Sequence, residues 1–107
     1  MIDSYEIVLY TFRAGISSTR DRAYKLKEIP EIGLKMLNDY EAEQGENVKL
    51  SVRDLIREQV IFTLDIADLK ALKQSNDYIE AGRFIENEVK AYDLSTKENY
   101  QTARGTL

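Results

Sequence analysis

Residues 48–73 read VKLSVRDLIREQVIFTLDIADLKALK, and the fold of the chain depends on whether they form one helix or two strands. Val48, Leu50 and Val52 alternate with polar residues, and the apolar residues of 62–66 do the same. Alternation of this kind is typical of strands that bury one face.

Two features of the same stretch favour a helix. It contains no glycine, proline or asparagine, so a hairpin would lack the usual turn residues. Ser51 and Asp54 have the spacing of a helix capping box, with Asp in place of Glu. We therefore predict one long, largely buried helix from about Val52 to Lys73. The alternative places a strand at Val60–Leu64.

The segments that precede this stretch are also predicted to be helical. Ser4 can cap a helix and Gly15 can end one. Residues 5–12 are rich in β-branched and aromatic side chains, however, so a strand there is the alternative. A second helix is expected at about 20–28, and Pro30 suits the first turn of a third.

The scarcity of proline and glycine decides the predicted fold class. One proline and five glycines in 107 residues favour long helices with short connections. We predict a mainly α fold, a compact bundle of four to five helices in a single domain at 1–94, followed by a polar C-terminal tail at 95–107. The alternative is an α+β fold with short strands near 5–12, 48–52 and 60–64.

The composition excludes several kinds of chemistry, because the chain contains no histidine and no cysteine. These residues supply the base of catalytic triads, thiolate nucleophiles and most zinc ligands. The carboxylates are spaced as on a solvated surface, and neither the P-loop nor the dinucleotide-binding glycine pattern occurs. We therefore expect no enzyme activity, no metal, no cofactor and no small-molecule substrate.

The same totals indicate a cytoplasmic protein. No apolar run approaches the roughly 20 residues that a membrane-spanning helix needs. The first residues have no basic region of the kind that begins a signal peptide. The lack of cysteine is compatible with a reducing compartment.

A stripe of apolar residues near the C-terminus predicts a contact surface. Tyr78, Ile85 and Tyr92 recur every seven residues, and Gly82 and Val89 lie on the same stripe, as in a helix–helix seam. Tyrosine is favoured at protein interfaces, and one further tyrosine stands alone in the polar tail. The predicted partner-binding residues are Tyr78, Gly82, Ile85, Val89, Tyr92 and Tyr100.

A basic patch at 13–27 predicts a second kind of contact. It holds five basic residues against a single acid, Asp21, and the hydroxyls of 17–19 could bind phosphate. The net charge of −4 argues against a generic phosphate-backbone binder. The candidate nucleic-acid-binding residues are Arg13, Arg20, Arg22, Lys25 and Lys27.

These observations lead to two hypotheses about function. The first is a small non-catalytic interaction protein that acts by self-association, as a homo-oligomer, or by docking on a larger macromolecular complex. Proteins of this kind are common among phage and mobile-element products, as assembly subunits or as inhibitors of host enzymes. The alternative is a nucleic-acid-binding regulator that uses the patch at 13–27.

Overall fold

The fold is α+β, with one antiparallel sheet of four strands in the order β2-β1-β3-β4. The computed structural model describes residues 3–13 and 15–105, with side chains described as far as residue 96. The strands are β1 (Tyr5–Thr11), β2 (Ser17–Ala23), β3 (Val48–Asp54) and β4 (Gln59–Ile66). The helices are η1 (Leu26–Glu28), α1 (Ile29–Asp39), α2 (Leu69–Lys73) and α3 (Asp77–Gly105). The predicted helical bundle is therefore wrong.

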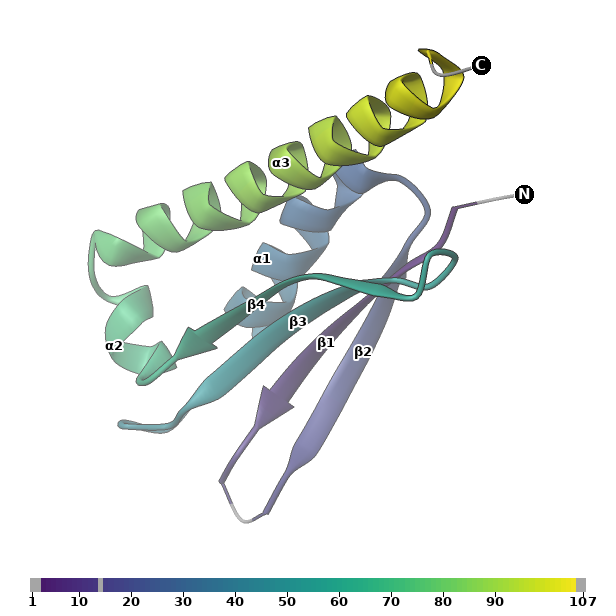
Figure 1. Cartoon of the computed structure of the whole chain (residues 1–107). Coiled ribbons are helices and arrows are strands. Elements are labelled where there is room, and N and C mark those ends of the chain that lie inside the picture. Colours follow the sequence, from purple (N-terminus) through teal and green to yellow (C-terminus); the bar gives the residue numbers. More distant parts are fainter. Residues whose placement is uncertain (1–2, 14, 106–107) are drawn as a thin grey trace.

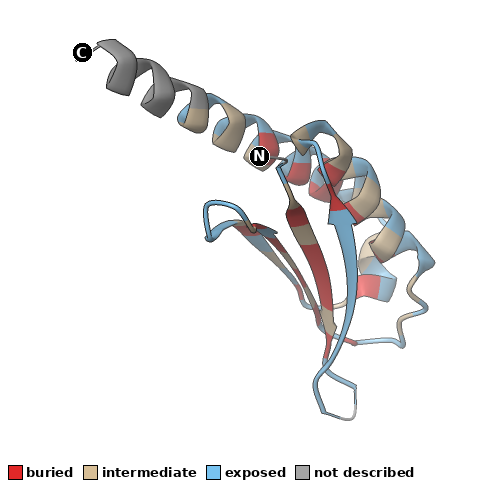
Figure 2. Ribbon diagram, turned by 90° about the vertical axis from the view of Figure 1, so that its right-hand side faces the viewer, coloured by how far each residue is buried: buried red, intermediate tan, exposed pale blue. Residues whose placement is uncertain are grey.

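The molecule has two layers, because the helices lie against one face of the sheet (Figures 1 and 2). Among the described residues, no helix covers the opposite face, which we call the open face. The core between the layers is apolar, and each fully buried Ile or Leu contributes roughly 1.5–3 kcal/mol. Its buried members are Tyr5, Ile7, Leu9, Ala23, Ile29, Leu37, Val48, Leu50, Val52, Phe62, Ile66, Leu69, Ile85 and Val89.

The helix predicted from Val52 to Lys73 is replaced by the β3–β4 hairpin. The turn of this hairpin contains no glycine, proline or asparagine, and Asp54 stabilises it instead. The Oδ1 atom of Asp54 accepts hydrogen bonds from the backbone N–H groups of Ile56 and Arg57, both at 3.0 Å. Glu58 completes the turn with a left-handed backbone, φ 54°. Asp54 thus caps a turn rather than a helix, and the alternation of 48–52 and 62–66 is that of strands.

The predicted helices at about 5–15 and 20–28 are also wrong. Residues 5–11 form β1, and Gly15, at φ 113°, belongs to the loop that leads into β2. β2 pairs with β1 along its whole length, from Tyr5 opposite Ala23 to Thr11 opposite Ser17. Because β2 is an exposed edge strand, its sequence has no apolar alternation, and the pairing with β1 determines its structure.

One other local prediction agrees with the structure, because Pro30 lies in the first turn of α1. α3 begins at Asp77. The backbone of 95–105, which was predicted to be a polar tail, continues α3. The α+β alternative placed strands where β1, β3 and β4 lie and had none at β2. None of the described helices is long and apolar enough to cross a membrane.

Candidate functional site

A buried carboxylate, Asp54, joins the β3–β4 turn to α3. Besides the two backbone groups of the turn, it accepts hydrogen bonds from the Arg57 guanidinium at 2.8 Å and from the Tyr92 hydroxyl at 2.7 Å. Burial alone would raise the pKa of Asp54, but the hydrogen bonds from Arg57 and Tyr92 outweigh it and hold this pKa below its ordinary value. Burial and the neighbouring Asp54 raise the pKa of Tyr92.

A second buried carboxylate, Glu46, joins the β1–β2 hairpin to the loop after α1. It accepts hydrogen bonds from the Arg13 guanidinium at 2.9 Å, the backbone N–H of Glu43 at 2.9 Å and the Tyr40 hydroxyl. Burial would raise the pKa of Glu46, but these donors hold it below its ordinary value. Lys73 donates to the carbonyl of Tyr40 nearby.

Each cluster joins parts of the fold that are far apart in the sequence. General acid–base catalysis near neutrality needs a group with a pKa close to the working pH. The pKa values of Asp54 and Glu46 are shifted away from that range, and those of their tyrosine partners are raised. Among the side chains that the structure describes, those of residues 3–13 and 15–96, no three acidic groups gather where a metal ion could be held.

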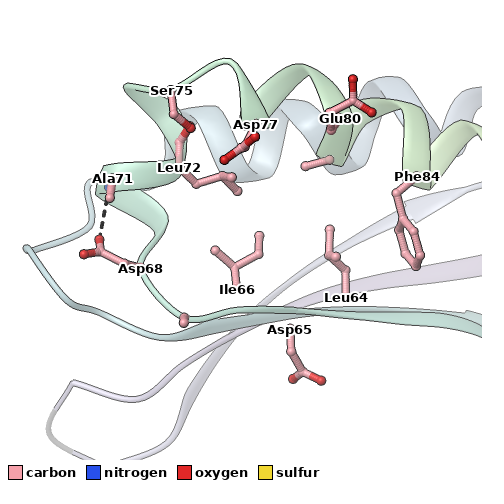
Figure 3. A pocket seen from close by; sticks show the side chains of 12 residues that line it. Leu64, Asp65, Ile66, Asp68, Ala71, Leu72, Ser75, Asp77, Glu80 and Phe84 are labelled. Atoms are coloured by element: carbon pink, nitrogen blue, oxygen red, sulfur yellow. Dashed lines mark hydrogen bonds between the residues drawn. The ribbon is translucent and has the colours of Figure 1, made fainter.

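A groove lies between β4 and the helices α2 and α3. Leu64 and Ile66 point from β4 toward the helices, and Phe84 points from α3 toward β4, whereas Asp65 points to the opposite side of the sheet (Figure 3). The hollow has a volume of about 560 Å³, and Leu72 and Ala81 add to its apolar lining. Four carboxylates, those of Asp65, Asp68, Asp77 and Glu80, also line it. We call the edge of β4 together with these five apolar side chains the β4 groove.

The two edges of the sheet differ in their protection against pairing with another chain. Natural proteins commonly protect edge strands with charged side chains. The β2 edge carries Arg20, Asp21 and Arg22, whereas β4, QVIFTLDI, has a single charged residue near its end. Beside that edge, the side chains of Val60 and Phe84 are 57% and 38% exposed. The β4 edge is therefore apolar and unpaired within the described chain, and its one irregularity is a shift in register opposite Val52 and Arg53.

The residues predicted to form a partner-binding seam lie on the inner side of α3. Ile85 and Val89 are buried in the core, and the Tyr78 hydroxyl donates to the carbonyl of Leu34 at 3.4 Å. Gly82 faces the side chain of Leu34, and Tyr92 donates to Asp54. A helix that covers a sheet needs such an apolar stripe for its own packing. Contact of these residues with a partner stays a prediction, and the side chain of Tyr100 lies outside the described residues.

The structure separates the five predicted nucleic-acid-binding residues. Arg20 and Arg22 project from β2 on the open face, while Arg13 is engaged by Glu46. Lys25 and Lys27 lie beyond β2, at and within η1.

Sequence reasoning missed two further cations of the open face. Lys49 and Arg53 come from β3, which is paired with β1. Their alternation with the buried side chains of β3 would have revealed them once that strand was recognised.

Comparison of the chain with protein-family models, curated proteins and solved structures gave no match. Two surfaces of the molecule are candidates for binding a partner, the β4 groove and the open face. The first is apolar and the second is polar and basic, so they suit partners of different chemistry.

Proposed function

We propose that this is a non-catalytic interaction protein that self-associates through the β4 groove. The observation that most directly supports self-association is the unpaired apolar edge of β4, which lies beside a hollow lined by Leu64, Ile66 and Phe84. The cytosol is the compartment that we propose, because a chain without cysteine has no need of an oxidising environment.

Strand addition is the binding mode that this geometry supports. A fifth strand beside β4 would take up its free N–H and C=O groups, and its inward side chains would fill the groove. Main-chain hydrogen bonds and side-chain pockets would then act together. Val60 and Phe84, two of the large apolar side chains exposed in the monomer, would lose their contact with water.

A second copy of β4 is a suitable occupant on grounds of charge. When two β4 strands pair antiparallel about a two-fold axis, the two Asp65 side chains lie opposite each other in only one register, the one whose axis passes through Asp65. In every other register of the two strands, Asp65 faces an uncharged residue of β4 or none. An isologous two-fold interface is also the commonest arrangement in homo-oligomers.

The experiment is sedimentation equilibrium on the full chain and on Val60→Lys. We expect the wild type to form dimers with rising concentration, and the variant to stay monomeric, because a lysine at this edge would be buried in the dimer. Val60 is exposed in the monomer, so the circular-dichroism spectrum should not change. Ile16→Lys is the matched control, since Ile16 is 75% exposed but lies in the β1–β2 loop.

Two results would contradict the proposal. One is a wild-type protein that stays monomeric up to its solubility limit. The other is equal dissociation by Val60→Lys and Ile16→Lys, which would mean that the added charge acts without regard to position.

A further inference from the structure

The open face of the sheet carries a set of side chains that self-association does not use, apart from Val60 and Asp65 at the β4 edge. The strand register places three rows across it. In order from β2 to β4, these are Ser18, Tyr10, Lys49 and Asp65, then Arg20, Val8, Ser51 and Thr63, then Arg22, Glu6, Arg53 and Val60. The face thus has four cations and two carboxylates, although the chain as a whole has a net charge of −4.

Two of the cations on this face are free to bind an anion. Arg20 is paired with Glu6 at 3.3 Å and Lys49 with Asp65 at 3.5 Å, so both carboxylates are neutralised. In the described part of the chain, the guanidinium groups of Arg22 and Arg53 have no carboxylate within ion-pair distance. The register sets them on either side of Glu6, two strand spacings or roughly 10 Å apart.

We infer that the open face binds single-stranded nucleic acid, with Arg22 and Arg53 contacting the phosphate backbone. Hydroxyl groups at Ser18, Ser51 and Thr63 lie on the same face, with Ser51 between Lys49 and Arg53 along β3, and can donate to phosphate or sugar oxygens. The half-buried ring of Tyr10 offers a surface on which a base can stack. This activity is independent of the proposed self-association, because it uses the opposite side of the sheet from the groove.

Two comparisons favour this ligand. Four strands span roughly 14 Å, which is wider than the major groove of about 12 Å, so the face suits a splayed single strand better than a duplex. An acidic protein segment fits less well, because protein interfaces have an apolar centre. The apolar residue at the centre of this face, Val8, is only 2% exposed.

The experiment is fluorescence anisotropy with labelled oligo-dT and oligo-rU of equal length, at two salt concentrations. We expect binding that weakens as salt rises, and a loss of about tenfold or more at low salt in the double variant Arg22→Ala/Arg53→Ala, with a shallower salt dependence. Lys70→Ala/Arg83→Ala is the matched control, since it removes the same charge from exposed sites on the helical layer. It should bind as the wild type does, apart from the small effect of net charge.

Three results would overturn the inference. They are no binding at low salt, equal losses in the two double variants, and equal or tighter binding of labelled poly-glutamate, which would assign the face to an acidic protein segment. Phe84→Gln, a neutral change on the helical layer, separates the two proposals. If it abolishes self-association and leaves oligonucleotide affinity unchanged, the open face acts independently, and if both are lost the face does not bind by itself.

Discussion

At the scale of single residues, Asp54 shows why the hairpin was missed. Its side chain accepts hydrogen bonds from backbone N–H groups two and three residues further along the chain. Ser and Asp side chains accept hydrogen bonds from nearby backbone N–H groups both at helix N-termini and in turns. The spacing of Ser51 and Asp54 therefore does not distinguish a helix start from a turn. The deciding contact is with Tyr92, 38 residues away, which no local pattern reveals.

Removing the Tyr92 hydroxyl tests the role of that contact. Tyr92→Phe should lower the free energy of unfolding by about 1–2 kcal/mol, because buried Asp54 would lose one of its donors. Urea denaturation measures the change. Tyr24→Phe is the control, since Tyr24 is exposed, and it should change stability by less than about 0.5 kcal/mol. Equal effects of the two substitutions would contradict this role for Tyr92.

The two buried carboxylates also predict how stability depends on pH. Asp54 and Glu46 have lower pKa values in the folded chain than in the unfolded chain, so the unfolded chain takes up protons first as pH falls. Their stabilisation is present above the ordinary carboxyl pKa of about 4 and is lost as pH falls below it. The urea midpoint should therefore decrease steeply between about pH 5 and 3. In Asp54→Asn the urea midpoint should decrease less steeply over this pH range. An unchanged steepness would contradict the contribution of Asp54 to the pH dependence of stability.

Among the helices and strands, those that bury one face on the core were easier to predict from the sequence than those that are exposed. β1 and β3 both pack one face on the core. The alternation of β3 and the β-branched and aromatic composition of β1 are why strands near 48–52 and 5–12 stood as alternatives. β2 is exposed along nearly its whole length, so its sequence contains no such pattern. α1 begins at Ile29, and Pro30 lies in its first turn, as predicted from the sequence.

The two helical glycines should respond differently to a methyl group. A Cβ at Gly82 would lie 3.4 Å from the flexible Leu34 side chain, so Gly82→Ala should stabilise by about 0.5–1 kcal/mol through helix propensity. Gly33→Ala should stabilise less, because its Cβ would lie 3.3 Å from buried Leu50. Urea denaturation compares the two, and a larger gain at Gly33 would contradict the prediction.

At the scale of the whole molecule, the candidate surfaces depend on strand order. The apolar stripe of α3 was predicted correctly as a stripe, but the fold uses it to cover its own sheet. Arg20 and Arg22 were identified from the sequence, whereas Arg53 joins them because β3 pairs with β1. The β4 groove combines β4 with Phe84, and such a combination follows only from the tertiary fold.

Self-association of the whole molecule should be visible in its thermal unfolding. If folded chains pair through β4, the melting temperature of the wild type should rise with protein concentration, because association stabilises the folded state by mass action. That of Val60→Lys should be independent of concentration. Scanning calorimetry at several dilutions makes the comparison, and a wild-type melting temperature that does not vary would count against pairing.

The bond between Tyr92 and Asp54 also matters while the chain is being synthesised. Asp54 leaves the ribosome 38 residues before the phenol that completes its set of donors. Until then, the β3–β4 turn has its local hydrogen bonds but lacks the donor from α3. A nascent chain that stalls before α3 is made would have only α1 and α2 to cover the apolar side of its sheet, and the uncovered part would be open to chaperones.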